Sequence, residues 1–294
     1  MSLLAVPNLA EGRDPKRIAE LEAAFARGVA VLDRHSDPDH NRTVLTISGV
    51  AGALVDALAS GAEAAIDSID MSEWEGLHPC IGALDVCPIV WLDPGDRDPA
   101  RAEALAIAER IGGLGVPVFL YGELANRRER AERAYFREGG LTELSARMQG
   151  GILRADQGPD RPHPTAGATL VTARPPLAAF NVELDTGDAE TARTIAGGLR
   201  ESGGGLPGVR AIGLRLSSGR AQISTNVHDP GATPLGTVVE RIQALAEPLG
   251  ARPLEAELVG LVPERALSGY PDGVPIRGFD PNLHVIERRL PGAA

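Results

Sequence analysis

The chain has 294 residues, enough for two domains that each bury a hydrophobic core. Its formal net charge of −11 argues against non-specific nucleic-acid binding, because neutralising phosphates requires a surplus of lysine and arginine on one face. An anionic small molecule is not excluded, because such a ligand needs only a local cluster of arginines.

The sequence contains no long apolar segment and no secretion signal at its N-terminus. We therefore expect a cytoplasmic protein that makes no use of a membrane. The two cysteines, Cys80 and Cys87, are too few for a disulfide framework and lack the spacing of a zinc site. We expect both to be free thiols.

In the first half of the chain, strand and helix patterns alternate, which predicts an α/β fold. Predicted strands occupy residues 3–6, 29–32, 42–48, 86–92 and 116–121. Predicted helices begin at Asp14-Pro15 and Arg97, and others occupy residues 52–69, 126–140 and 141–148. In the helix that begins at Arg97, the predicted buried residues are Ala104, Leu105, Ala108 and Ile111. The arginines of residues 126–140 are predicted to form a solvated face.

Residues 33–41 are rich in Asp, His, Ser and Pro, which predicts a loop. His35, Asp37, Asp39 and His40 could be considered as metal ligands. Their spacing matches no standard metal site, so the favoured interpretation is a hydrogen-bonded turn that lines a pocket.

Residues 156–167 contain several prolines and glycines, which exclude regular secondary structure and make the segment stiff. From the residues alone it is either an interdomain connection or the wall of a ligand site, and both can hold, because ligands often bind at domain junctions. Pro175-Pro176 marks the predicted domain boundary.

The second half predicts the β-α-β-β-α-β order of a ferredoxin-like domain. The predicted strands are residues 178–184, 209–216, 220–226 and 255–259, and the predicted helices are residues 188–201 and 235–249. The Gly203-Gly204-Gly205 run follows a helix and precedes a strand, which is the reverse of a phosphate-binding loop. We interpret it as a turn.

His78 lies where the helical pattern of residues 52–69 gives way to the next strand. Pro79 restricts the backbone of His78 to extended conformations, so the imidazole is presented by a stiff segment. Because histidine titrates near neutrality, it can take up and return a proton in one reaction. A single loop histidine is nevertheless more often structural than catalytic.

The stretch around His78 has the pattern IDM-(x)5-LHP-(x)2-GALDVCP and resembles the active-site loop of the glutamate formiminotransferase family. Further motifs of that family occur in the same order over nearly the whole chain. They are VPN at 6–8 with EG at 11–12, DPDHNRT at 37–43, PVFLYGE at 117–123, the loop at 158–169, FN at 180–181, LPGVR at 206–210, STN at 224–226 and ELVGLVP at 257–263.

The resemblance implies an α/β fold of two α/β sandwich subdomains, residues 1–175 with the catalytic histidine and residues 176–294, with a ligand groove between them. It implies transfer of a formimino group from N-formimino-L-glutamate to N5 of tetrahydrofolate, a co-substrate, in histidine degradation. No metal is expected, and the expected state is a homodimer. His78 matches the catalytic residue of the family. The folate-contacting loop of the family maps onto Gly158, Pro159, Asp160, Arg161, Pro162, His163, Pro164, Thr165, Ala166 and Gly167.

Four positions depart from the pattern of the family. Many relatives have Arg at the position of Cys80, and some have Glu at that of Leu77; mammalian members have Asp at His35 and an aromatic residue at Ala166. The alternatives are therefore a folate-binding protein without rapid turnover and a formyl-transfer enzyme acting on 5-formyltetrahydrofolate.

Overall fold

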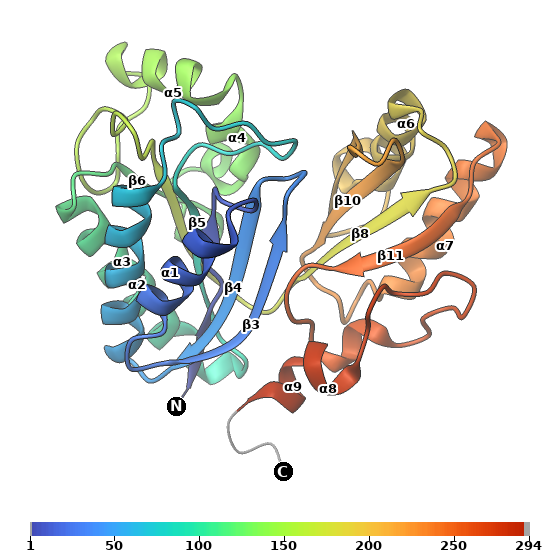
Figure 1. Ribbon diagram of the computed structural model, residues 1–294, viewed down its shortest axis with the longest axis horizontal. Coiled ribbons are helices and arrows are strands. Elements are labelled where there is room, and N and C mark those ends of the chain that lie inside the picture. The colour runs from blue at the N-terminus through green and yellow to red at the C-terminus, as the bar shows by residue number, and fades with distance from the viewer. Residues whose placement is uncertain (1, 291–294) are drawn as a thin grey trace. The chain divides into compact units, whose positions relative to one another are not determined.

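The computed structural model describes residues 2–290 (Figure 1). The chain divides into two compact units, residues 1–175 and residues 176–294, and each contains a β-sheet with helices packed against it. The predicted α/β class with two α/β subdomains is therefore confirmed, whereas the ligand groove between them stays a prediction. No helix within residues 2–290 is long and apolar enough to cross a membrane.

The first unit is built on a sheet that has seven strands within the described residues. They are β1 (Leu3–Ala5), β2 (Asn8–Leu9), β3 (Ala30–Asp37), β4 (Arg42–Gly49), β5 (Leu84–Val90), β6 (Val118–Leu120) and β7 (Thr169–Arg174). β1 and β2 lie one after the other between β4 and β5, antiparallel to both. β3 pairs with β4 at one edge, and β7 and then β6 extend the sheet from β5 as parallel strands.

Helices pack against both faces of this sheet (Figure 1). They are α1 (Pro15–Phe25), α2 (Ala53–Ser68), α3 (Arg97–Gly113), α4 (Arg133–Arg137) and α5 (Gly140–Gln149), with 3-10 turns η1 (Pro94–Asp96), η2 (Gly122–Leu124) and η3 (Arg128–Ala131). Leu170 and Val171 are neighbours in β7 and point to opposite faces. Val171 joins the core formed with α1, α2 and α3, and Leu170 joins the core formed with α4 and α5. The parallel strands are therefore buried on both sides, as parallel sheets usually are.

Several local predictions for this unit are wrong. Residues 33–37, predicted as a loop, belong to β3, because their backbone pairs with β4 while alternate side chains face solvent. β7 has no counterpart among the predicted strands. Residues 126–140, predicted as one helix, contain only η3 and the short α4 before α5 begins at Gly140. Leu105, predicted to be buried, is 46% exposed, whereas Ile107, which was not predicted, is fully buried.

The second unit has the predicted β-α-β-β-α-β order. Its elements are β8 (Ala178–Leu184), α6 (Ala189–Leu199), η4 (Glu201–Gly203), β9 (Val209–Arg215), β10 (Ala221–Val227), α7 (Leu235–Ala246), η5 (Glu247–Leu249), β11 (Pro253–Leu258), η6 (Glu264–Leu267), α8 (Pro281–His284) and α9 (Ile286–Arg289). The four strands are antiparallel in the order β11-β8-β10-β9, and α6 and α7 bury Ile195 and Val239 in the core. The ferredoxin-like prediction is confirmed.

The contact between α1 and α2 requires a glycine, which gives a first prediction. A Cβ atom at Gly61 would lie 2.3 Å from the fully buried ring of Phe25. Gly61→Ala should therefore lower the free energy of unfolding by about 1–3 kcal/mol, measured by urea unfolding. Gly113→Ala in α3 is the matched control, because nothing lies within 4 Å of its Cβ position. Equal losses in the two variants would contradict this account of the α1–α2 contact.

Candidate active site

His78 lies in the connection between α2 and β5, at residues 69–83. This segment begins in the core, where Ile69 and Met71 are buried, and it then comes to the surface. The side chain of His78 is half-buried. The loop is therefore anchored by apolar burial at its start and presents the imidazole near solvent.

Backbone hydrogen bonds tie the His78 loop to the predicted folate loop, residues 158–167. The Met71 N–H donates to the Thr165 carbonyl at 2.7 Å, and the Ala83 N–H donates to the Ala166 carbonyl at 3.0 Å. These bonds lie on either side of His78 in sequence. The structure thus brings together the two segments that the sequence resemblance assigned to catalysis and to folate.

Two glycines allow this close approach. A Cβ atom at Gly82 would lie 1.9 Å from the Ala168 carbonyl oxygen, and one at Gly167 would lie 2.2 Å from the Ile81 carbonyl oxygen. Gly167 also has a φ of +67°, which residues with a Cβ rarely adopt. The register between the two loops therefore depends on glycine at both positions.

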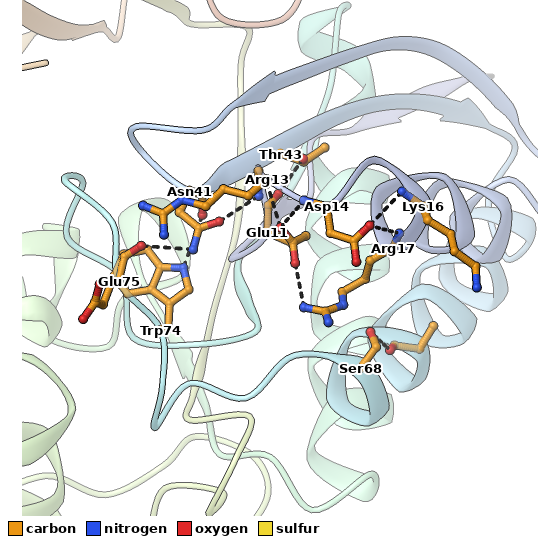
Figure 2. Close-up of polar contacts among 12 residues, drawn as sticks. Glu11, Arg13, Asp14, Lys16, Arg17, Asn41, Thr43, Ser68, Trp74 and Glu75 are labelled. Atoms are coloured by element: carbon orange, nitrogen blue, oxygen red, sulfur yellow. Dashed lines mark hydrogen bonds and ion pairs between the residues drawn. The ribbon is translucent and has the colours of Figure 1, made fainter. Parts of the chain in front are cut away.

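Asn41 joins the His78 loop to two further segments (Figure 2). Its side chain accepts a hydrogen bond from the Gly12 N–H at 2.9 Å and donates one to the Glu75 carbonyl at 3.0 Å. Its own carbonyl accepts the Trp74 indole N–H at 3.3 Å. With a φ of +46°, Asn41 adopts the left-handed conformation that asparagine tolerates better than most residues. The segment just before His78 is thereby fixed.

A buried carboxylate lies beneath the His78 loop. Asp85, in β5, is fully buried and forms ion pairs with Arg42 of β4 and Arg137 of α4, whose side chains are 11% and 8% exposed. Its other oxygen accepts the Ile81 N–H at 3.0 Å. Burial raises the pKa of Asp85, but Arg137 and Arg42 outweigh this effect and hold the pKa below its ordinary value. Asp85 therefore links a strand, a helix and the His78 loop as an ionised group.

The environment of His78 defines its tautomer. Its Nδ1 lies 2.9 Å from the Pro79 carbonyl oxygen, which can only accept a hydrogen bond, so Nδ1 carries the proton and Nε2 has the lone pair. The ring stacks on the buried imidazole of His40, with centroids 5.8 Å apart. His78 can therefore act as a base through Nε2.

The pKa of His78 is lowered well below its ordinary value. Burial is the largest cause, and Arg42 and Arg137 add repulsion against an imidazolium. The imidazole is thus neutral at physiological pH, as a base requires. Once protonated, it is a stronger acid than an ordinary histidine and readily gives the proton back.

The two cysteines are free thiols, which confirms the prediction. Burial raises the pKa of Cys80 to about 12, and burial also raises the pKa of Cys87 to about 12. Because a thiolate and not a thiol is the nucleophile, Cys80 is unreactive near neutral pH despite its closeness to His78 in sequence.

The predicted folate loop is an ordered turn. His163 and Gly167 exchange backbone hydrogen bonds at 2.8 and 3.0 Å, and the His163 Nδ1 accepts the Ala166 N–H at 3.0 Å. Asp160 accepts the Ala155 N–H at 3.0 Å, while Arg161 is exposed. The loop therefore has a defined shape and offers a cation to solvent.

The turn between β3 and β4 is hydrogen-bonded, as predicted. Asp37 accepts the His40 N–H at 2.8 Å, and the Asp39 carbonyl accepts the Leu77 N–H at 3.1 Å. His35 was predicted in the same loop, but it lies in β3 opposite Val44. The expectations that this turn lines a pocket and that no metal binds stay predictions.

Sequence reasoning missed the ion pairs of Asp85 and misassigned two arginines. Arg130 and Arg137, predicted to be solvated, have side chains only 9% and 8% exposed and pair with Asp156 and Asp85. An aspartate within the otherwise apolar strand LDVCPIV was the available signal, because a buried carboxylate requires a cationic partner. The sequence could not indicate which arginine supplies it.

The second prediction concerns Asp85. Asp85→Asn leaves two buried guanidinium groups without their counter-charge, so the free energy of unfolding at neutral pH should fall by about 3–5 kcal/mol. Urea unfolding measures this change. Because the pKa of Asp85 is lowered by folding, its contribution is lost as pH falls through the folded pKa, and the difference between variant and wild type should shrink in acid.

The matched control is Asp56→Asn. Asp56 pairs with Arg110 at 3.2 Å, but both side chains are largely exposed, so removing this charge should change stability by less than about 1 kcal/mol. Similar effects at Asp56 and Asp85 would show that burial does not set the strength of the Asp85 ion pairs.

Comparisons with known proteins cover both units. A family model described as "Formiminotransferase domain, N-terminal subdomain" matches residues 2–174, and one described as "Formiminotransferase domain" matches residues 179–270. Together they match more than half of the chain.

Similar curated proteins have matching names. The chain is 36% identical over 302 residues to "Glutamate formimidoyltransferase" of Thermoplasma acidophilum, covering 100% of this chain and 99% of that protein. It is 35% identical over 292 residues to the protein of the same name in Streptococcus pyogenes, covering 98% of each. It is 39% identical over 272 residues to "Formimidoyltransferase-cyclodeaminase" of Sus scrofa, covering 89% of this chain and 50% of that longer protein.

Proposed function

The chain belongs to the formiminotransferase family, and from this premise we propose that it is a glutamate formimidoyltransferase. It moves the formimino group of N-formimino-L-glutamate to N5 of tetrahydrofolate and yields 5-formiminotetrahydrofolate and L-glutamate. The observation that carries the proposal is a histidine with a lowered pKa, His78, on a loop that is hydrogen-bonded to residues 158–167.

In the first step, the N5 amine of tetrahydrofolate attacks the formimino carbon. As the N5–C bond forms, the C=N π bond of the formimino group, protonated as an amidinium, breaks, and its electron pair becomes a lone pair on the former imino nitrogen. The carbon is now tetrahedral, and the positively charged N5 must lose its proton. The Nε2 atom of His78 accepts this proton, because Nδ1 already holds one against the Pro79 carbonyl.

In the second step, the lone pair on the former imino nitrogen re-forms the C=N bond, and the bond between that carbon and the glutamate nitrogen breaks. The leaving nitrogen needs a proton, and the His78 imidazolium supplies the one taken from N5. Arg42 and Arg137 favour this return, because they repel the additional positive charge of the imidazolium. One group thus serves as base and then as acid, and no net proton is exchanged with solvent.

The loop at residues 158–167 would hold tetrahydrofolate beside His78. Its internal hydrogen bonds and its bonds to the His78 loop support this role, since a preformed site loses less entropy on binding. Holding both substrates near one base adds the advantage of proximity. We further propose, from the family resemblance, that the protein is a cytoplasmic homodimer, needs no metal and acts in histidine degradation.

The proposal is tested by incubating the purified protein with tetrahydrofolate and either formiminoglutamate or formylglutamate. Formation of 5-formiminotetrahydrofolate from formiminoglutamate is the expected result. Formation of 5-formyltetrahydrofolate alone would identify a formyl-transfer enzyme. Tight folate binding without either product would identify a folate-binding protein.

The third prediction concerns His78 in this reaction. His78→Ala should lower turnover by about 10²–10⁴-fold, because proton transfer assists the transition state. The melting temperature and the affinity for tetrahydrofolate should stay nearly unchanged, because the ring is only half-buried and forms no ion pair with another described residue. A structural histidine would give the opposite pattern, with a lower melting temperature and full activity per folded molecule.

The fourth prediction concerns the folate loop. His163→Ala removes the acceptor for the Ala166 N–H and loosens the turn, so KM for tetrahydrofolate should rise about tenfold while kcat changes little. Steady-state kinetics with varied tetrahydrofolate measures both. Ile152→Ala, which removes a largely exposed side chain before the loop, is the control. An unchanged KM in His163→Ala would argue against folate binding at this loop.

A further inference from the structure

A second group of cations extends from the Asp85 ion pairs along the same face of the first unit. Arg133 begins α4 and lies one helical turn before Arg137, so the two side chains share a face of the helix. Arg137 pairs with Asp85. The side chain of Arg133 is half-buried, and no hydrogen bond or ion pair to another described residue is formed by its guanidinium.

The ends of two parallel strands complete this group. Tyr121 follows β6 and its N–H donates to the Val171 carbonyl of β7 at 3.1 Å, and Arg174 is the last residue of β7. Arg133 and Arg174 interact electrostatically with each other and with the buried Tyr121. The Arg174 guanidinium donates only to the Pro175 carbonyl among the described residues. Arg133, Arg174 and Tyr121 are called the Arg133 cluster below.

Positive charge in this region exceeds negative charge. The region around Asp85 and the Arg133 cluster contains four arginines, Arg42, Arg133, Arg137 and Arg174. Among the described residues, Asp85 is the one carboxylate within 4.0 Å of any of these arginines. Burial lowers the pKa of Arg133 and lowers that of Arg174 to about 10, with repulsion between the arginines as a further cause. Buried charges in proteins are normally paired, so these two arginines lack a counter-ion.

We infer that the Arg133 cluster binds a carboxylate of the donor, an N-acylated glutamate; this rests on the proposed function. Arginine presents a planar fork of donors that matches a carboxylate, and the Tyr121 hydroxyl adds a neutral donor. Occupancy by an anion would supply the missing counter-charge for Arg133 and Arg174.

The position of the cluster favours the donor over the glutamate tail of folate. Arg133 is one helical turn from Arg137, which is close enough to His78 to affect its titration. In an N-acylated glutamate, both carboxylates are only a few bonds from the carbon that reacts. In folate, the p-aminobenzoyl group separates N5 from the glutamate tail. A carboxylate bound beside the catalytic base is therefore that of the donor.

The test uses Arg133→Gln, with Arg133→Lys as the charge-conserving variant and Arg128→Gln, an exposed arginine of η3, as the control. Isothermal titration calorimetry with N-formyl-L-glutamate and its two monoamides measures binding without turnover. The wild type should bind the diacid best, and Arg133→Gln should bind it about 10- to 100-fold more weakly. Arg133→Gln should also lose discrimination against one monoamide, whereas Arg133→Lys keeps part of it and Arg128→Gln all of it.

The melting temperature distinguishes donor binding by Arg133 from a structural role, and the affinity for tetrahydrofolate distinguishes it from folate binding. Arg133→Gln removes a cation without a counter-ion, so it should not melt below the wild type. Unchanged binding of N-formyl-L-glutamate, or weaker binding of tetrahydrofolate instead, would overturn the inference. If the wild type shows the expected acylglutamate binding but transfers no formimino group, the proposed function fails while the carboxylate site stands. If the wild type transfers the formimino group and Arg133→Gln binds the donor normally, the proposed function stands and the carboxylate site at the Arg133 cluster is wrong.

Discussion

The site depends on one buried carboxylate, that of Asp85. It has no access to solvent, so its charge must be balanced by Arg42 and Arg137, and these two ion pairs fix β4, β5 and α4 relative to one another. The same carboxylate accepts the Ile81 N–H and so holds the chain just after His78. Through the two arginines, Asp85 also determines which charges surround the imidazole. Loss of this carboxylate would therefore affect stability, loop geometry and proton affinity together.

Beyond the buried Ile69 and Met71 at its start, the His78 loop is held by hydrogen bonds to neighbouring segments. Hydrogen bonds from Met71 and Ala83 join it to residues 158–167, and Asn41 joins it to the β3–β4 turn. Such bonds fix position without placing bulky side chains in the space that a substrate needs. A base of lowered pKa, a folate loop and a carboxylate site on one unit would together suit the proposed exchange of one nitrogen for another at a single carbon.

The sequence predicted the elements whose signals are local. The cap and proline at Asp14-Pro15 mark the start of α1, and apolar periodicity gives α2, α6 and α7 with their buried residues. The start of β3 was predicted, but residues 33–37 escaped prediction because these polar residues pair through the backbone. The Arg137–Asp85 ion pair escaped because its partners are 52 residues apart. His78 and residues 158–167 were singled out by resemblance to a family. Their hydrogen-bonded proximity comes from long-range pairing that no local pattern encodes.

The central claim is that burial, together with the arginines held by Asp85, keeps His78 neutral with its proton on Nδ1. The most direct measurement is the titration of the histidine side chains by ¹H–¹⁵N NMR, with His78→Gln to assign the signal among the six histidines. The account predicts that His78 remains the Nδ1–H tautomer as pH falls through 6.5 and is protonated only well below that value. A His78 that titrates at or above pH 6.5, or that carries its proton on Nε2, would contradict it.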